Sequence, residues 1–234
     1  MTELSLPPLF QSMATQGEPP FALACRLARE GCDAGLVTYE LRPDMLRAAI
    51  VFAPEVPLDQ AVIMLPICGV GFQNALGALA PPEVGVHLEW NGNIRVNGGV
   101  AGSLKMAAHP DTPESEPDWL VIGLELALWP AEEDTGLTPD VTALFAEGCA
   151  DVEAPALLEA WTRHSLVWIN RWLDDGARPV HTEWNGLAHG LKEPATFNGT
   201  GGEFIGVDEN FGMILQSDDC TTIIPLTKIL TEVS

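Results

Sequence analysis

The residues whose types and spacing suggest chemistry gather in one glycine-rich stretch, "HLEWNGNIRVNGGVAGSLKM" (residues 87–106). Two corners, "NGN" and "NGG", interrupt its alternating apolar positions, so the stretch predicts a hairpin with strands near 84–90 and 93–106. Lys105 is the first of only three lysines in the chain. The question is whether this hairpin lines an active site or is the remnant of one. Any phosphate-handling chemistry here would have few cations available.

Metal and thiol chemistry find little support in the spacing of the histidines and cysteines. The five histidines form no HxH or HExxH pattern, so we expect no metal site. The five cysteines are scattered without a CxxC pair, which argues against a disulfide framework and a structural zinc site. Cys25 and Cys68 lie on predicted helices and should be inert. Cys149 is flanked by acidic residues, which raise a thiol pKa.

Composition limits the classes of partner. Hydrophobic residues make up 47% of the 234 residues and there are seven tryptophans, as is typical of a globular protein. The net charge of −22 would repel nucleic acid and anionic membrane surfaces. No secretion signal is evident at the N-terminus, so we expect a cytoplasmic protein. The apolar segment 61–80 fits a core helix better than a membrane span.

The surrounding pattern predicts the elements that would position the hairpin. Apolar spacing predicts a helix over 21–32, and Trp161, Trp168 and Trp172 recur on one face of a later helical region, as in a core seam. Short alternating runs after Gly190 predict a small β structure. The other expectations are strands at 34–41, 47–54 and 119–129, an exposed loop at 107–118, and helical structure from 139 to 190.

The hairpin and its surroundings resemble the biotin and lipoate protein ligase family. Biotin ligases carry a run of the form W-P-N-D-I-x-V-N-G-x-K-x-A-G-I-L, which this chain matches at Trp90, Ile94, Val96, Asn97, Gly98, Ala101, Gly102 and Leu104. The tail "GVDENFGMIL" (206–215) is similar to the C-terminal domain of that family. The resemblance implies an α+β fold, in which a mixed sheet with flanking helices (1–190) precedes a small SH3-like β-barrel (191–234).

Several departures from the family pattern affect the expected chemistry. The Gly/Arg-rich loop that handles ATP is missing, with Arg42 and Arg47 as its only remnants, and Gly99 or Val100 stands where the family has lysine. Glu89 reverses the charge of a lysine common in relatives. Lys105 lies six residues beyond Gly99, roughly 20 Å along an extended strand, and cannot replace that lysine. It is expected to be a surface charge at the end of the strand or an ion-pair partner of a nearby acid.

The resemblance with these departures implies a retained pocket for a small molecule or acyl group without conventional ATP-dependent ligase activity. Two alternatives stay open. One is an active ligase using ATP with biotin or lipoate, and the other is a cysteine-dependent acyltransferase. No catalytic residue is identified, and the identity of the ligand and the oligomeric state, a homodimer included, stay open. The ligand-binding residues implied by the resemblance are Arg42, Trp90, Asn93, Gly99, Val100, Ala101, Gly102, Ser103 and Gly123.

Overall fold

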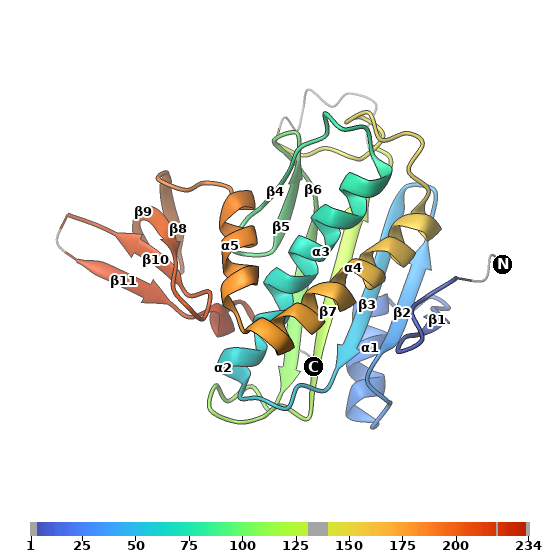
Figure 1. Cartoon of the computed structure of the whole chain (residues 1–234), viewed down its shortest axis with the longest axis horizontal. Coiled ribbons are helices and arrows are strands. Elements are labelled where there is room, and N and C mark those ends of the chain that lie inside the picture. Colours follow the sequence, from blue (N-terminus) through green and yellow to red (C-terminus); the bar gives the residue numbers. More distant parts are fainter. Residues whose placement is uncertain (1–3, 131–139, 219, 233–234) are drawn as a thin grey trace.

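The computed structural model describes residues 4–130, 140–218 and 220–232, which form two β-sheets with flanking helices (Figure 1). The larger sheet has seven strands and is mixed, and the smaller one has four antiparallel strands built from the end of the chain. The fold is therefore α+β, with a mixed sheet, flanking helices and a separate small β domain consistent with an SH3-like barrel, as the sequence predicts.

The large sheet has the strand order β1-β2-β3-β7-β6-β5-β4. Strand β1 runs parallel to β2, and the other neighbours in the sheet are antiparallel. The central strands β3 and β7 are almost wholly apolar, because they are covered on both faces over most of their length. In chain order the strands are β1 (Gln11–Ala14), β2 (Leu36–Leu41), β3 (Met45–Phe52), β4 (Val86–Leu88), β5 (Asn93–Val96), β6 (Gly99–His109) and β7 (Trp119–Ala127).

Helices α3 (Met64–Leu79) and α4 (Ala154–Asp175) pack against each other over one face of this sheet (Figure 1). The Trp161 indole is fully buried, and its Nε1–H donates to the Cys68 carbonyl oxygen at 3.0 Å. The Trp168 indole donates to Asn74 Oδ1 at 2.7 Å. The tryptophans thus form the core seam that their spacing predicts.

The apolar segment before the hairpin packs inside the protein. In the described part of the chain, one helical stretch, Leu58–Leu79, is long and apolar enough to cross a membrane, and it includes the short helix α2 (Leu58–Ala61). Because 72% of its most apolar window is buried against other parts of the chain, it serves here as a core helix.

Gly71 sets the close approach of α3 to α4. A Cβ at this position would lie 2.6 Å from Ser165 Oγ and 2.9 Å from the Ser165 nitrogen, which belongs to the backbone. We expect Gly71→Ala to lower the free energy of unfolding by about 1–3 kcal/mol, measured by urea denaturation. Gly77→Ala on the same helix is the control, since its nearest neighbour is 3.8 Å away. Equal effects of the two changes would contradict this packing.

Helix α1 (Pro20–Arg29) lies on the opposite face of the sheet, over one end of β2, β3 and β7. Ala24, Cys25 and Ala28 form a second, smaller core there with residues of β3 and β7. At the edge of the part of the sheet that packs against α1, a Cβ on Gly123 would lie only 2.6 Å from Phe21 Cδ2. The glycine therefore lets the Phe21 ring rest directly on strand β7.

Three expectations about element boundaries are wrong. The segment 93–106 is two strands, because Asn97 (φ 49°) and Gly98 (φ 96°) make a tight turn between β5 and β6. The loop expected at 107–118 begins only after His109, because β6 continues to that residue and Ala107 is buried. The first part of the expected helical region is turns: the described residues 140–153 contain no helix, and helical structure begins with α4.

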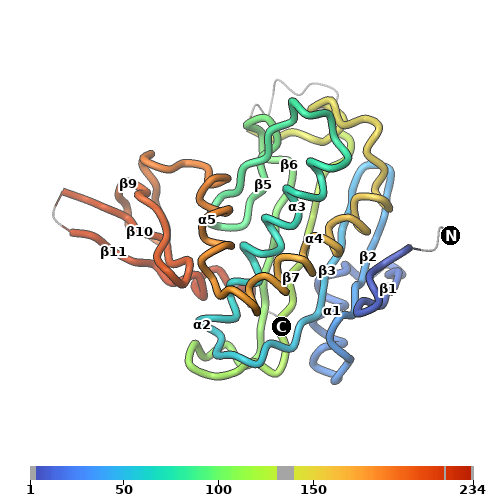
Figure 2. The backbone as a smooth tube through the Cα atoms, in the orientation of Figure 1, coloured from blue at the N-terminus to red at the C-terminus, as the bar shows by residue number. Residues whose placement is uncertain are grey.

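The small sheet is attached to the large domain at both ends of its segment (Figure 2). It follows helix α5 (Arg178–Leu187), after which His189 N–H donates to the Leu88 carbonyl oxygen at 2.8 Å. Near the chain end, Thr231 N–H donates to the Met106 carbonyl oxygen of β6 at 2.7 Å. Its strands, ordered β11-β10-β9-β8, are β8 (Pro194–Phe197), β9 (Thr200–Val207), β10 (Met213–Gln216) and β11 (Thr221–Ile224).

Candidate functional site

Gly99, one of the two positions at which the lysine of the family pattern could stand, is closed by a threonine. A Cβ built on Gly99 would lie 2.8 Å from Thr142 Cγ2 and 2.9 Å from Thr142 Cβ. Thr142 is held there because its N–H donates to the Val100 carbonyl oxygen at 2.9 Å, while Val100 N–H donates to Asp140 at 2.8 Å. A long cationic side chain at Gly99 would therefore require this segment to move.

The connection between β2 and β3 is a tight turn of three residues. Arg42 N–H donates to the Met45 carbonyl oxygen at 2.9 Å, and the Arg42 guanidinium binds Asp44 through Nε and Nη2, each at 3.1 Å. Arg42 also borders a cavity of about 350 Å³, together with Trp129 and Phe145, whose rings stack on each other. The turn leaves no backbone loop that could surround a phosphate chain.

A row of polar residues crosses five strands on the sheet face opposite α3 and α4. Direct cross-strand neighbours along this row are Glu40 and Arg47, Arg47 and Glu125, Glu125 and Ser103, and Ser103 and Asn93. Directly paired residues share a face. The row lies beyond the end that α1 covers, and it contains two of the expected ligand-binding residues, Ser103 and Asn93.

The charged side chains of this row pair with each other and with Lys105. Arg47 Nη1 lies 3.3 Å from Glu40 Oε2, and Arg47 Nε lies 3.8 Å from Glu125 Oε1. Lys105 Nζ lies 3.1 Å from Glu125 Oε2, so of the two expectations for Lys105 the ion pair is confirmed, while the residue lies inside β6 and not at its end. Glu125 therefore lies between the two cations, while Arg47 Nε, 3.8 Å from it, is buried and makes no hydrogen bond.

Glu89, which reverses a charge relative to the family, is paired as well. Its carboxylate binds Arg95 Nε and accepts a hydrogen bond from Asn93 Nδ2 at 2.8 Å. Arg95 and Asn93 flank Ile94, which is buried in the core on the α3 side, so both point to the other face. We call this surface the charged face; its members are Glu40, Arg47, Glu89, Asn93, Arg95, Ser103, Lys105 and Glu125.

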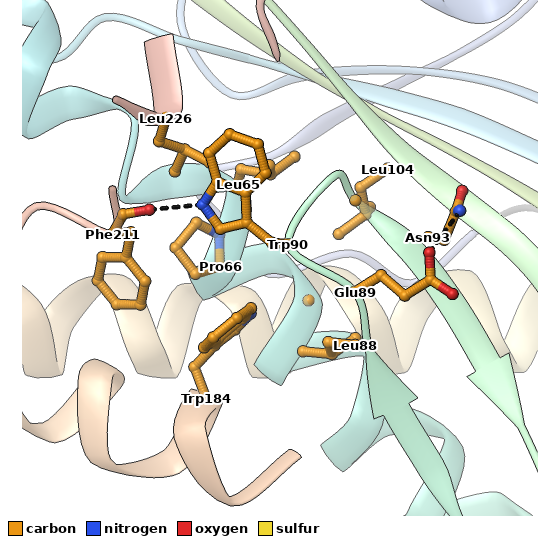
Figure 3. Close-up of a pocket in the computed structure, with 12 residues that line it drawn as sticks. Leu65, Pro66, Leu88, Glu89, Trp90, Asn93, Leu104, Trp184, Phe211 and Leu226 are labelled. Atoms are coloured by element: carbon orange, nitrogen blue, oxygen red, sulfur yellow. Dashed lines mark hydrogen bonds between the residues drawn. The ribbon is translucent and has the colours of Figure 1, made fainter. Parts of the chain in front are cut away.

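Trp90 lies at the junction of the two sheets, beside a pocket that Glu89 and Asn93 also line (Figure 3). Its indole Nε1–H donates to the Phe211 carbonyl oxygen at 2.7 Å, and its ring meets that of Phe197 edge-on at 5.2 Å. The pocket beside it measures about 20 Å³, enough for one water molecule. The junction is therefore a packed contact between domains, to which Trp184 and Leu226 also contribute.

The remaining expected site residues lie on or beside strand β6. Gly102 allows a close approach, because a Cβ there would lie 2.3 Å from the Glu125 carbonyl oxygen. Ala101 is 3% exposed and belongs to the main core. Gly123 is the cross-strand partner of Lys105 and carries the Phe21 ring described above. The structure thus brings Asn93, Ser103 and Gly123 to one face, and places Arg42, Trp90 and Ala101 elsewhere.

Six members of the charged face were not among the expected site residues: Glu40, Arg47, Glu89, Arg95, Lys105 and Glu125. A charged residue inside an otherwise apolar strand, as in "WLVIGLELA", is the signal that could have identified Glu125. The sequence cannot show that Glu125 meets Lys105 and Arg47, because that depends on the register of three strands.

The buried thiols are poorly suited to nucleophilic chemistry. Burial raises the pKa of Cys25 and of Cys68 to about 12. Burial, with a smaller contribution from Glu147, also raises the pKa of Cys149, in the direction expected from its acidic neighbours. Hydrogen bonds from Ser217 and Thr222 lower the pKa of the exposed Cys220. In the described ranges no cluster of three or more His, Cys, Asp or Glu side chains is placed to hold a metal ion.

The chain is similar to known protein families and to solved structures. The model of the biotin/lipoate A/B protein ligase family matches residues 6–186, and a domain of unknown function, DUF4444, matches residues 191–232. A biotin protein ligase-like protein of unknown function from Silicibacter sp. TM1040 is 59% identical, with a TM-score of 0.94 over 98% of this chain and all of that chain. A search of curated protein sequences found no match.

Distant biotin ligases share the fold. The Aquifex aeolicus biotin protein ligase is 13% identical, with a TM-score of 0.74 over 92% of this chain and 95% of that chain. The Leishmania major biotin protein ligase in complex with biotinyl-5-AMP is 16% identical, with a TM-score of 0.59 over 93% and 98% of the two chains. Because the family model covers most of the sequence, this chain belongs to the biotin/lipoate A/B protein ligase family.

Proposed function

We propose that this protein is a member of the family that does not form adenylates and instead binds a small molecule or an acyl group on the charged face beside β6. The three-residue turn from β2 to β3 is the observation that carries the proposal. A transferring phosphoryl group needs backbone N–H groups and cations fixed around it. Here the Arg42 guanidinium is bound by Asp44, and the turn contains no loop to supply the N–H groups.

The surroundings of Gly99 support the same proposal. Thr142 occupies the space into which a side chain at Gly99 would extend, so no cation reaches the ligand from there. Loss of one preorganised donor typically lowers the rate about 100- to 1000-fold, and this chain lacks several together. Binding a ligand requires fewer fixed donors and cations than phosphoryl transfer does. The residues present on β6 are therefore compatible with ligand binding.

The wider assignments are part of this proposal. We infer that the chain divides into a ligase-like domain, 1–190, and a small β domain, 191–234. We also infer that the protein acts in the cytoplasm, with no nucleic-acid or membrane partner. The net charge of −22 supports the absence of polyanionic partners, because phosphate backbones and anionic lipids would be repelled.

An active ligase is the second candidate, favoured by two observations. The charged face carries the cations Arg47 and Lys105, and solved relatives are described in complex with biotin and ATP and with biotinyl-5-AMP. However, Arg47 is paired with Glu40 and Lys105 with Glu125, which weakens the case for an active ligase.

Isotope exchange between pyrophosphate and ATP separates the two candidates. We incubate the purified full-length chain with Mg-ATP and with biotin, lipoate or octanoate. We expect no more exchange than in a blank that contains none of these acids. The Aquifex aeolicus biotin protein ligase, assayed with biotin in parallel, is the positive control. Exchange that requires one of the three acids would identify an active ligase and overturn the proposal.

A further inference from the structure

A cavity of about 420 Å³ lies at the C-terminal end of helix α1, near the point where strand β6 ends in His109 (Figure 1). His109 points to the same side of the sheet as Lys105, because alternate residues of a strand share a face. Between them, Ala107 is buried in the small core under α1, so about 13 Å of strand separates Lys105 from the cavity. We call this space the α1 cavity, and it is distinct from the charged face.

The α1 cavity has apolar walls and a polar rim. Ala28, Val51 and Trp119 line it and are buried in the small core under α1. Arg29 and Asp118 also line it, and both side chains are exposed, so the rim carries charges of both signs. An apolar wall with a few polar groups, in a volume of roughly 300–1,000 Å³, is typical of sites for small organic molecules.

The indole of Trp119 supplies a hydrogen-bond donor that the protein does not use. Its side chain is only 5% exposed, yet its Nε1–H makes no hydrogen bond within the described part of the chain. The buried indoles of Trp90, Trp161 and Trp168 each donate to an oxygen, at 2.7, 3.0 and 2.7 Å. Trp184 is the other buried indole that does not donate, and it too lines a pocket. Since a buried tryptophan usually satisfies its N–H, the Trp119 donor is left for water or a ligand.

Other polar side chains at the rim can also bind a ligand. His109 is the direct cross-strand neighbour of Trp119, and the two ring centroids are 6.2 Å apart. Among the described residues, neither the His109 imidazole nor the Asp118 carboxylate has a hydrogen-bond or ion-pair partner. The Arg29 guanidinium has five N–H donors, so it can bind a ligand carboxylate in addition to its other contacts. The rim therefore offers groups for an anion and for a cation.

We propose that the α1 cavity binds a small zwitterion, an α-amino acid with an apolar side chain. The ligand carboxylate accepts a hydrogen bond from Trp119 Nε1–H and pairs with Arg29, and the ammonium pairs with Asp118. The apolar side chain lies against Ala28 and Val51. Such a ligand has no net charge, so the chain, at −22, does not repel it as it would an anion of the same size. This site is independent of the proposed function of the charged face.

Calorimetry on the full-length chain tests the inference with L-phenylalanine and L-leucine at pH 7.5. We expect at least one of them to bind with a Kd of about 0.1–1 mM, as is usual for ligands of this size. Phenethylamine and isopentylamine lack the carboxylate, and 3-phenylpropionate and 4-methylpentanoate lack the ammonium. Each analogue should bind about tenfold more weakly than its amino acid, because one charged contact is lost. No binding by either amino acid, or equal binding by an analogue, would overturn the inference and leave the proposed function intact.

Protection of Cys32 from alkylation shows whether the amino acid binds in this cavity. Cys32 is half-buried and lines the α1 cavity, whereas Cys220 is exposed and lies between β10 and β11. The reaction of each thiol with iodoacetamide is followed by mass spectrometry. At five times its Kd, the amino acid should slow labelling of Cys32 about sixfold and leave that of Cys220 unchanged. An unchanged rate at Cys32 would place the amino acid elsewhere and contradict the inference.

Asp118→Asn isolates the contact with the ammonium. The exposed side chain keeps its shape and loses its charge, so binding of the amino acid should weaken about tenfold, while that of the analogue without an ammonium should not weaken. Glu116→Gln is the matched control, because it removes an exposed carboxylate from the same loop outside the cavity, and a change within about twofold is expected. Trp119→Phe removes the indole donor and should weaken binding about threefold to tenfold. An unchanged Kd in Asp118→Asn would refute the assigned orientation and with it the inference.

Discussion

Trp161→Ala should lower the free energy of unfolding by about 3–5 kcal/mol, because the change empties the centre of the interface between α3 and α4. Trp161 is the largest fully buried side chain in the described part of the protein. Its removal would also leave the Cys68 carbonyl oxygen without the indole donor at 3.0 Å. Urea denaturation followed by circular dichroism would measure the change.

Trp129→Ala is the matched control for this result. The Trp129 side chain is 51% exposed and its ring lies against that of Phe145 at a tilt of 31°, so we expect a change within about 1 kcal/mol. If Trp161→Ala also stayed within that range, the close packing of α3 on α4 would be wrong.

Trp90→Ala should cost about 3–5 kcal/mol and loosen the small sheet from the large domain. The side chain is 5% exposed, and it contacts Phe197 and the Phe211 carbonyl oxygen of the small sheet. Limited proteolysis is the second readout: the variant should be cleaved near residues 188–193 more rapidly than the parent chain. These residues connect α5 to β8.

Trp90→Phe separates the hydrogen bond from the packing. Phenylalanine keeps most of the ring in the junction but cannot donate to the Phe211 carbonyl oxygen, so a loss of about 1–2 kcal/mol is expected. Resistance of both variants to proteolysis, at the level of the parent chain, would show that Trp90 does not hold the two domains together.

The fold could be predicted where the pattern is local. The helical spacing of Ala24, Cys25 and Ala28 predicts α1, and the tryptophan spacing predicts the seam between α3 and α4. The prediction of one strand over 93–106 is wrong because the Asn97–Gly98 turn looks like a minor break in an alternating run. The prediction of helix from residue 139 is wrong because 140–142 pairs with the start of β6 through backbone hydrogen bonds.

The site was less accessible to sequence reasoning, because its properties depend on contacts between distant strands. The missing loop at Arg42 and the missing lysine at Gly99 are visible as departures from the family pattern. Thr142 lies 43 positions after Gly99 in the chain, and its place beside that glycine follows only from the pairing with Val100. Likewise, the ion pairs among Glu40, Arg47, Glu125 and Lys105 need the register of β2, β3, β7 and β6.

The two attachments of the small sheet have a mechanical consequence. A rigid body fastened at both ends of its own segment cannot pivot about a single hinge. Any swing away from β4 must break the bond from His189 to Leu88 and the bond from Thr231 to Met106 together, so the motion is cooperative and costly. The small sheet is therefore held to the large domain at two separate points, one on β4 and one on β6.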